Sequence, residues 1–585
     1  MTRLSTAATP APVAPRRRDR AGCGALRVGA DGMSRLPTAA PPARVARRDP
    51  IRDGARLCAR GRRATARRAF FPLALLAALA LFAGCDDGPA ATPDAAAPDA
   101  AALDAATPDA ALPDAAAHAP WTPAPPPSRE IPEALRGDTW VAHYRDDILP
   151  YWSTPDALGE PPGNFPTERD MNGETRPNRE RRPRMLGRQI YTYAMGYALT
   201  GDVELLRRAR TGVDWLLTHA RDPRGGFHPL LTADGRPVGG AKTAQDLSYA
   251  AMGLAAWYFV TRDPAAEAEL LALRDLLFDP NGFYDEDNQR IRDGMSADLG
   301  EAFDVEGDGG WELVAQLDPI NAFLLLVQPV LSDAGRRAQV LGDLRTLTDT
   351  LIARFWSDGI FWGVHDRQGA YGTRHVDFGH TLKSYWMVFQ VDKRLPGAPY
   401  RPFVEAHAAA WVERAYDDEY GRWAKRPTGA TGEEYGSDWW IYAEADQLAA
   451  ALDMVDPRFV DTLAATAGNW LRDYVDPLPP HGIIPGVRRD GSPAYGWPRS
   501  DTAKCNQWKN GYHATEHALI LYLHGRDLED RPATLHFAVA PAAVEGFVAR
   551  PYLFEGTEID RRPGDRIDVG GLSLQTVAVD FVDIH

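Results

Sequence analysis

"RQIYTYAMGYALTGDVELLRRARTGVDWLLTHA", residues 188–220, contains two runs in which apolar residues recur at helical spacing. The two runs break at "TGD", residues 200–202, and the second is followed by the Gly- and aromatic-containing stretch "DPRGGFH". Glycine and acidic residues at such a position are typical of turns. This part of the sequence therefore predicts a helical hairpin that ends in a β-like turn.

Turns of the same kind recur along the chain. The stretches "DPNGFYDE", "SDGIFWGVHD" and "DDEYGRW" repeat the pattern, and the acidic residues Asp222, Asp279, Asp358 and Asp418 are 57, 79 and 60 residues apart. A period of roughly 60 residues suits two helices and one turn. Residues 129–530 have room for about six such pairs. The pattern predicts an all-α fold, an (α/α)6 barrel of about six helical hairpins. An open solenoid is the alternative, and the bulky aromatic residues in the turns favour a closed ring.

The last part of the sequence has a different period. "ATLHFAVAP", "GFVARPYLF" and "LSLQTVAVDFV" alternate between apolar and polar residues, which is typical of strands. Residues 531–585 are therefore expected to form a small C-terminal β appendage to the barrel.

The N-terminal part divides into three segments before the barrel. Residues 1–66 form a basic leader without periodicity, and residues 67–85, "RRAFFPLALLAALALFAGC", have the composition of a secretory signal. The small residues before Cys85 resemble a bacterial lipobox, which implies cleavage before Cys85 and attachment of lipid to it. A plain signal peptide with a chance cysteine is the alternative. Residues 86–128, rich in Pro, Asp and Ala, are expected to be a disordered tether.

These segments together predict a protein that is lipid-anchored in the bacterial cell envelope. The membrane would be reached through the lipid on Cys85, at the outer membrane, at the cell surface or on the periplasmic face. The formal net charge of −15 argues against nucleic acid as a partner. Of the four cysteines only Cys505 follows Cys85, so we expect no disulfide within the folded part.

Five stretches together resemble one family, the N-acylglucosamine 2-epimerase superfamily, which includes cellobiose 2-epimerases and aldose–ketose isomerases. They cover roughly residues 188–522 in the family's order. The resemblance implies an (α/α)6 barrel, no metal and no other cofactor, and a mono- or oligosaccharide substrate whose chemistry is proton transfer beside a carbonyl. The stretches are "RQIYTYAMGYALTGD", "DPRGGFHPLLTADGRPVGGAKTAQDLSYAAMGLAAWY", "DFGHTLKSYW", "DWWIYAEADQLAAAL" and "WKNGYHATEHAL".

The expected chemistry explains the residue types that the resemblance points to. Moving the proton on C2 of an open-chain aldose requires a base active near neutral pH, a group that returns the proton, and a cation beside the developing oxyanion. The family's two catalytic histidines match His380 in "FGH" and His513 in "WKNGYH", and its substrate-binding arginine matches Arg188. The alternatives are two core histidines with satisfied hydrogen bonds and an arginine that pairs with a carboxylate.

Further residues are candidates for binding the sugar. Trp439, Trp440 and Trp508 would stack on the apolar faces of a pyranose, although packing of inner helices would also use them. The resemblance matches Glu444 to a glutamate that contacts substrate, where an ordinary buried acceptor is the alternative. Asn321 stands where family members often carry another histidine.

Two charges depart from the family pattern. Lys383 follows His380 by three residues, where the family usually has an acidic residue, and Glu516 follows His513 by three, where an arginine is common. An ammonium near His380 would favour its neutral form, so we expect Lys383 to modulate His380 as general base. Glu516 would then compensate near His513. This inversion points to a different substrate, such as an anionic sugar, or to a catalyst that has lapsed.

Three functions remain open from the sequence. The first is a carbohydrate epimerase or isomerase. The second is a glycoside hydrolase or lyase on the same barrel, which needs two opposed carboxylates, with Asp246, Asp377 and Glu444 as candidates. The third is a surface sugar-binding protein with a decayed catalytic site. The positions of the carboxylates distinguish the second from the first, and an assay of proton exchange distinguishes the third.

Overall fold

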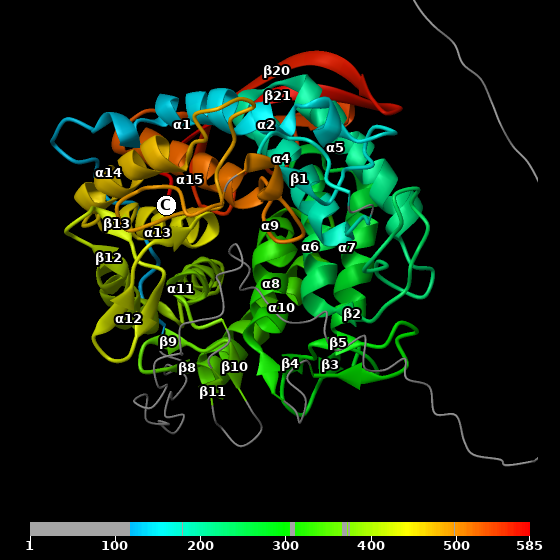
Figure 1. Cartoon of the computed structure of the whole chain (residues 1–585), viewed down its shortest axis with the longest axis horizontal. Coiled ribbons are helices and arrows are strands. Elements are labelled where there is room, and N and C mark those ends of the chain that lie inside the picture. Colours follow the sequence, from blue (N-terminus) through cyan, green and yellow to red (C-terminus); the bar gives the residue numbers. More distant parts are fainter. Residues whose placement is uncertain (1–116, 178–179, 305–309, 366–370, 373–374, 497) are drawn as a thin grey trace, which may run out of the picture. The chain divides into compact units, whose positions relative to one another are not determined.

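The computed structural model describes residues 117–177, 180–304, 310–365, 371–372, 375–496 and 498–585 (Figure 1). The basic leader 1–66, the signal segment 67–85 with Cys85, and most of the tether 86–128 lie outside the described residues. The predictions made for these segments are therefore not addressed by the structure.

Six helical segments form the inner ring of a barrel. They are buried along almost their whole length, as expected of apolar helices surrounded by other helices. Helices α4, α6 and α8 pack on one another in turn, as do α11, α13, α15 and α4, and Lys383 on α11 reaches Asp318 on α8, so the ring is closed (Figure 1). The inner segments are α4 (Pro183–Thr200), α6 (Ala244–Thr261), α8 (Leu313–Pro319) continued by α9 (Leu325–Val327), α11 (Phe378–Asp392), α13 (Trp439–Asp453) and α15 (Tyr512–Leu528).

An outer layer of helices covers the ring. Five of them follow their inner partner in sequence, but α1, near the N-terminus, packs on α15, near the C-terminus. The sixth hairpin of the predicted barrel is therefore made of two helices that are far apart in sequence. The outer helices are α1 (Gly137–His143), α2 (Leu149–Trp152), α5 (Val203–Trp215), α7 (Pro264–Leu277), α10 (Ala334–Thr350), α12 (Arg401–Ala415) and α14 (Val460–Asn469), with the short α3 (Pro155–Leu158) beside α2.

Acidic and hydroxyl side chains fix where several of these helices begin. Asp202 accepts a hydrogen bond from the backbone N–H of Glu204 at 2.9 Å at the start of α5, and Thr243 accepts one from Asp246 at 3.0 Å at the start of α6. Such N-caps satisfy backbone donors that have no partner inside the helix. Helix α8 ends at Pro319, and a π-turn (Ile320–Leu324) separates it from α9 because proline cannot continue the hydrogen-bond ladder.

The β-like turns that the sequence predicted are present as short antiparallel hairpins between outer and inner helices. Further two- and three-residue strands lead into the inner helices at the same end of the barrel. The hairpins are β3 (Tyr284–Asp285) with β4 (Arg290–Ile291), β8 (Trp356–Ser357) with β9 (Ile360–Phe361) and β12 (Tyr416–Asp417) with β13 (Arg422–Trp423). The other short strands are β1 (Arg169–Asp170) with β18 (Ala503–Cys505), β2 (Lys242–Thr243) with β5 (Gly294–Met295) and β6 (Ala302–Phe303), β7 (Trp311–Glu312) with β10 (Val364–His365) and β11 (Tyr371–Gly372), β14 (Arg426–Thr428) with β15 (Gly432–Glu434), and β16 (Ser437–Asp438) with β17 (Gly486–Val487).

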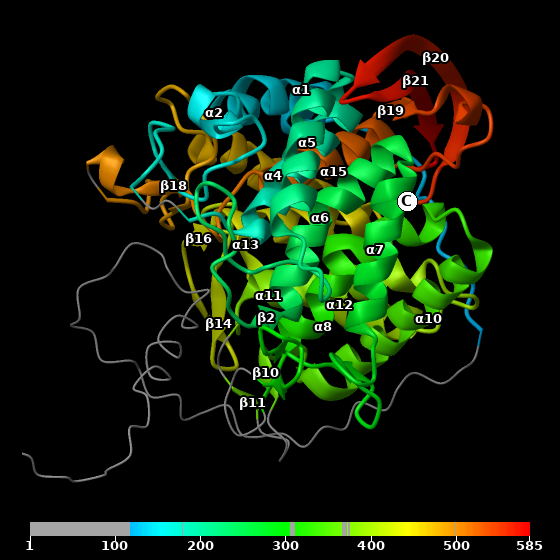
Figure 2. The same cartoon turned by 90° about the vertical axis from the view of Figure 1, so that its right-hand side faces the viewer.

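The C-terminal region forms an antiparallel sheet in the order β19 (Ala533–Val539), β21 (Leu572–Val582), β20 (Thr557–Val569). The strand expected at 546–554 is wrong, since those residues form turns and β20 lies further along the chain. The sheet packs closely on the barrel: β19 lies against α4, α6 and α15 (Figure 2). The hydroxyl of Tyr197 on α4 donates to the carbonyl of Phe537 at 2.8 Å.

One helical stretch among the described residues, Leu313–Val330, is long and apolar enough to cross a membrane. It is 94% buried in the barrel, which is the position of a core helix. The predicted fold class is therefore what the described residues show: an (α/α)6 barrel with a small C-terminal sheet.

Candidate active site

A pocket of about 500 Å³ lies at the N-terminal ends of the inner helices. A larger cavity of about 670 Å³ lies beside Asp392, at the other end of α11, and contains none of the residues that the sequence singled out. We therefore take the smaller pocket as the candidate site. Seven of the predicted residues line it: Arg188, His380, Lys383, Trp439, Trp440, Trp508 and His513.

His380 is held by the residue that caps its own helix. Asp377 accepts a hydrogen bond from the backbone N–H of His380 at 2.7 Å through Oδ1, and its Oδ2 lies 2.7 Å from Nδ1 of the ring. The ring also packs on Trp440, with 4.8 Å between centroids. Gly379 permits this approach, because a Cβ there would lie 2.4 Å from the Trp440 ring. The "DFGH" sequence thus fixes the histidine and leaves Nε2 as its free nitrogen.

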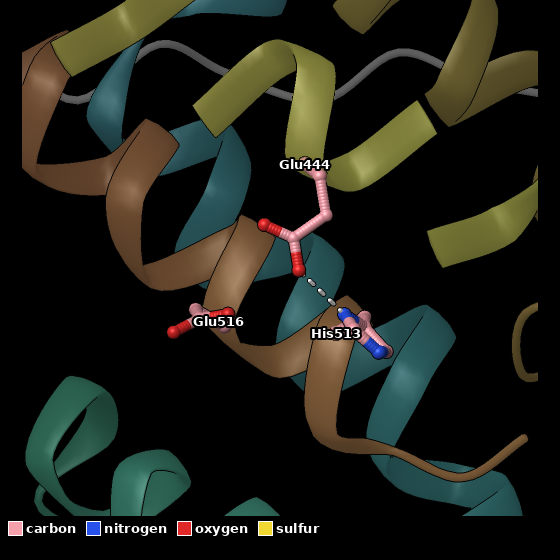
Figure 3. A group of neighbouring side chains, drawn as sticks. All are labelled: Glu444, His513 and Glu516. Carbon is pink, nitrogen blue, oxygen red and sulfur yellow. Dashed lines mark ion pairs between the residues drawn. The ribbon is translucent and has the colours of Figure 1, made fainter. Parts of the chain in front are cut away.

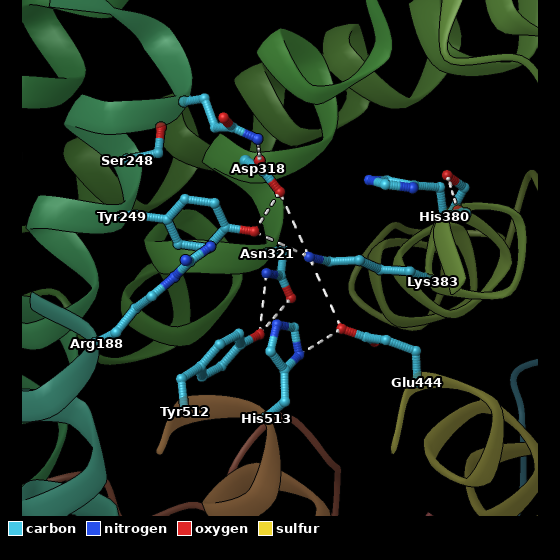
Figure 4. Close-up of polar contacts among 12 residues, drawn as sticks. Arg188, Ser248, Tyr249, Asp318, Asn321, His380, Lys383, Glu444, Tyr512 and His513 are labelled. Carbon is cyan, nitrogen blue, oxygen red and sulfur yellow. Dashed lines mark hydrogen bonds and ion pairs between the residues drawn. The ribbon is translucent and has the colours of Figure 1, made fainter. Parts of the chain in front are cut away.

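Lys383 does not act on His380 in the way that the sequence suggested. Its ammonium lies 3.4 Å from Asp318 and 3.8 Å from Glu444, and it donates to the hydroxyl of Tyr249 at 3.3 Å (Figure 4). Burial acts to lower the pKa of Lys383, but the acidic groups around it outweigh burial and raise the pKa above its ordinary value. The expectation is corrected: the carboxylate partner of His380 is Asp377, and Lys383 is a charged group among buried acids.

His513 lies on α15 with its Nδ1 3.2 Å from Oε1 of Glu444 (Figure 4). Burial, followed by the positive charges of Lys383 and Arg188, lowers the pKa of His513 well below its ordinary value. Burial raises the pKa of Glu444 to about 8, with Lys383 opposing the shift. At neutral pH His513 is therefore a neutral imidazole, which is the form that accepts a proton.

Glu516 lies near His513, as expected, but its hydrogen-bond partner is a tyrosine of the C-terminal region. It is completely buried and accepts a hydrogen bond from the hydroxyl of Tyr552, which in turn lies 2.8 Å from the hydroxyl of Tyr191. The carboxyl group of Glu444, 3.2 Å from Nδ1, is the acidic group in direct contact with the His513 ring. Burial raises the pKa of Glu516 and the charge of Lys383 opposes the shift, so the two groups interact as expected, but the hydroxyl that binds Glu516 comes from the loop between β19 and β20.

Arg188 and the three tryptophans form much of the pocket wall. The guanidinium of Arg188 stacks on Tyr249 at 3.5 Å from the ring centroid and donates to the backbone carbonyl of Trp508 at 3.1 Å. Trp440 neighbours both histidines, with 4.8 Å from its centroid to that of the His380 ring and 6.1 Å to that of the His513 ring. Aromatic faces beside charged donors are the combination that binds a sugar ring and its hydroxyl groups.

Asn321 and Glu444 were expected to contact substrate, but neither lines the pocket among the described residues. Asn321 donates through Nδ2 to the hydroxyl of Tyr512 at 3.0 Å, and Glu444 is completely buried behind His513. Both are corrected to positions that support the pocket wall from behind.

Three carboxylates were candidates for a glycoside hydrolase. Asp246 accepts from Arg184 at 2.7 Å, Asp377 is paired with His380, and Glu444 lies between His513 and Lys383. None of the three lines the pocket of the described residues. The geometry that a hydrolase needs, two carboxyl groups facing each other across the substrate, is not what these residues form.

Glu444, His513 and Glu516 offer ligand atoms that lie within 4.8 Å of one another, as three ligands of a metal ion would (Figure 3). Lys383 places an ammonium 3.8 Å from Glu444, and Tyr552 donates to Glu516. A positive charge and a hydroxyl donor already serve the two carboxylates, so the cluster is better suited to hydrogen bonding than to holding a cation.

Several residues of the site were not singled out from the sequence. Arg184 lies one helical turn before Arg188 and stacks on Trp508 at 3.9 Å, a spacing that could have indicated a shared face of the helix. Lys509 lies within the motif "WKNGYH", but nothing in the motif alone marks it as a residue of the pocket. Nothing in the local sequence distinguishes Tyr249 or Asp318, whose importance comes from contacts across the ring.

The comparisons agree with this fold. Residues 163–303 match the family model "N-acylglucosamine 2-epimerase (GlcNAc 2-epimerase)", a region that includes Arg188 but neither histidine. The cellobiose 2-epimerase of Bacteroides fragilis is 24% identical over 319 residues, which are 51% of this chain and 76% of that protein. The resemblance to the N-acylglucosamine 2-epimerase superfamily is confirmed.

Solved structures support the same architecture. The cellobiose 2-epimerase from Spirochaeta thermophila is similar with a TM-score of 0.58 and 19% identity, over 66% of this chain and 96% of that one. The cellobiose 2-epimerase from Bacillus thermoamylovorans has a TM-score of 0.56 and 16% identity, over 66% of this chain and 100% of that one. A D-mannose isomerase has a TM-score of 0.57 and 16% identity, over 68% of this chain and 100% of that one. At these identities the structural likeness concerns the fold.

Proposed function

We propose that this chain, which resembles the N-acylglucosamine 2-epimerase superfamily in sequence and fold, is a carbohydrate epimerase or isomerase that moves the proton on C2 of an open-chain aldose. The observation that carries the proposal is the pair His380 and His513. They come from two inner helices, line one aromatic pocket, and each has a carboxyl group within 3.2 Å of a ring nitrogen.

The first step is removal of the C2 proton. Neutral His513 takes the proton, and the electron pair of the C–H bond enters the enediolate that forms across C1 and C2. His380, the second histidine of the pocket, returns a proton to C2 for epimerisation or to C1 for isomerisation. Asp377 holds the ring and compensates its positive charge while it carries that proton. In the reverse direction the two histidines exchange roles, so His380 is then the base.

The developing negative charge needs a cation. Arg188 and Lys383 both line the pocket and both remain charged, so either can stabilise the enediolate. Water displaced from the pocket by the sugar would strengthen these interactions. No group outside the chain is needed for a transfer of this kind.

The direct test is proton exchange. When common aldoses are incubated with the full chain in deuterated water, NMR should show loss of the C2 proton signal together with a 2-epimer or a ketose. A binding protein with a decayed site would hold the sugar without any exchange, and that result would replace the proposal.

Asp377→Asn should slow C2 exchange by about 100-fold or more, because the ring of His380 loses the charge that holds it. Asparagine is as good an N-cap as aspartate, so the melting temperature should remain within a few degrees. Asp202→Asn, the same substitution at the N-cap of α5, is the matched control. It should change neither the rate of C2 exchange nor the melting temperature. Unaltered exchange in Asp377→Asn would mean that Asp377 serves only as a cap.

We further propose that the enzyme is tethered at the cell envelope. The support is the lipobox-like ending at Cys85 and the Pro/Asp/Ala-rich tether after it, both in the sequence alone. Cys85→Ser should move the protein from the membrane fraction to the soluble fraction after cell lysis, while Cys58→Ser, upstream of the cleavage point, should leave it in the membrane. Retention of Cys85→Ser in the membrane would contradict the anchor.

A further inference from the structure

The pocket is lined by more basic than acidic side chains. Six basic residues face it against three acidic ones: Arg176, Arg184, Arg188, Lys383, Lys425 and Lys509. A neutral sugar does not require this excess.

Most of these cations already have acceptors. Arg184 pairs with Asp246 at 2.7 Å, and Lys425 lies 3.6 Å from Asp438. Lys383 is surrounded by buried acids, as described above, and Arg176 donates to the backbone carbonyl of Asp501 at 2.9 Å. Arg184, Lys425 and Lys383 therefore have carboxylates of their own, whereas Arg176 is a half-buried side chain with a backbone carbonyl.

Lys509 is different. Its side chain is buried, with the residue 3% exposed, yet its ammonium has neither a carboxylate nor a hydrogen-bond acceptor among the described residues. Its ammonium lies over the ring of Trp439, 4.7 Å from Nζ to the centroid. Burial, followed by the charge of Lys504, lowers the pKa of Lys509 to about 7. An unpaired ammonium in such a place is unfavourable unless an anion accompanies it.

The backbone holds Lys509 firmly in this position. The side-chain oxygen of Asn506 accepts from the N–H groups of Trp508 and Lys509 at 2.8 and 2.7 Å, and the N–H of Asn506 donates to the carbonyl of Lys509 at 2.8 Å. This closed turn precedes α15, which carries His513. The lysine is thus part of the built pocket and is not a solvent-exposed side chain.

Arg188 is a second buried cation of the pocket wall for which the described residues provide backbone carbonyls and no carboxylate. It donates to the carbonyls of Gln507 and Trp508 at 3.3 and 3.1 Å, directly before Lys509 in the sequence, and its buried Nε has no acceptor. Arg188 and Lys509 both contribute to lowering the pKa of His513, so both are close to the proposed reaction centre.

We propose that Lys509 and Arg188 form an anion-binding subsite of this pocket, and that its sugar carries a carboxylate or phosphate group. The inference rests on the proposed function for the reaction at C2 and adds the class of sugar on which it acts. Arginine offers a planar pair of donors to such a group and lysine a point charge.

The test compares three sugars with the same configuration at C2: D-glucuronate, D-glucose 6-phosphate and D-glucose. Calorimetry gives their dissociation constants for the full chain, and NMR in deuterated water gives C2 exchange. We expect at least one anionic sugar to bind about 10- to 100-fold more tightly than glucose, the range of a charged hydrogen bond. The two anions distinguish a carboxylate subsite from a phosphate subsite.

Lys509→Met should reduce this anionic preference by about 10-fold or more, and Lys509→Arg should retain most of it. The matched control is Arg207→Met, which removes one positive charge from the outer helix α5 and not from the pocket wall, and which should leave the preference unchanged. The Lys509→Arg variant also reports on folding, because it keeps the charge in the same turn.

Two results would overturn the subsite: glucose binding as tightly as both anions, or an anionic preference that survives in Lys509→Met. The experiment can contradict the anion-binding subsite and the reaction at C2 independently of each other. Exchange with neutral sugars and no anionic preference removes the subsite and leaves the proposed function. An anionic preference in binding without exchange of any sugar supports the subsite and removes the proposed function.

Discussion

His513→Asn should lower C2 exchange by about 100- to 10,000-fold, the range that a positioned acid–base group contributes. Asparagine can occupy the space beside Glu444 but cannot take up a proton at neutral pH. His513 lines the pocket, and its pKa is lowered by burial and by neighbouring cations, so the wild-type ring is a base ready to accept a proton. Exchange measured by NMR in deuterated water, with sugar at saturation, checks the result.

His517 provides a matched control one helical turn further along α15. It is completely buried, its Nε2 lies 2.8 Å from Asp446, and it does not line the pocket. His517→Asn should therefore lower the melting temperature and leave exchange per folded molecule nearly unchanged, the opposite of His513→Asn. If His513→Asn mainly reduces stability and retains exchange, His513 is a core histidine and the mechanism is wrong.

Lys383→Met should destabilise the fold by about 3–5 kcal/mol, the usual effect of removing one partner from a buried ionic group. Asp318 and Glu444 are 2% and 0% exposed, so water cannot replace the lost ammonium. The pKa of Lys383 is raised, hence its stabilising contribution is fully present at neutral pH and would be lost only in strong alkali. Denaturant midpoints of the full chain measure the change.

The loss of stability in Lys383→Met should depend on pH, and the sign of that dependence follows from Glu444. The pKa of Glu444 is raised from 4.5 to about 8, so this group makes the fold less stable as the pH rises through that interval. Lys383 opposes the shift, and its removal should make the penalty larger at pH 8 than at pH 5. Adding Asp318→Asn to Lys383→Met should recover part of the stability by removing one uncompensated charge. A penalty that is the same at both pH values and in the double variant would contradict the buried ionic group.

The local sequence was sufficient for the helical hairpins. Apolar spacing and turn residues within 188–220 predict α4, α5 and the turn between them, because each depends on neighbours three or four residues apart. The prediction failed at 546–554, where alternation was taken for a strand and the chain instead forms turns that place Tyr552 against Glu516. Alternation in a short stretch does not show whether a partner strand lies beside it, and a strand needs that partner.

The motifs likewise identified which histidines to examine but not their partners. "DFGH" contains both His380 and the aspartate that holds it, three residues apart, so that pair is local and the sequence already contained it. The partner of Lys383 is on α8, 65 residues away, and the partner of His513 is on α13, 69 residues away. Spacing along one helix suggested that Lys383 would act on His380, whereas its ammonium points across the ring.

The sequence by itself determined the repeated helical hairpins, which follow from periodicity, and it identified the two histidines through short motifs that resemble those of a known family. The tertiary structure decided that α1 pairs with α15 as the sixth hairpin, that Glu516 is paired with Tyr552, and that Lys509 lies buried without an acceptor among the residues described. The physical reason is that charges in a closed ring are balanced by groups on other helices, whose distance in space has no fixed relation to their distance along the chain.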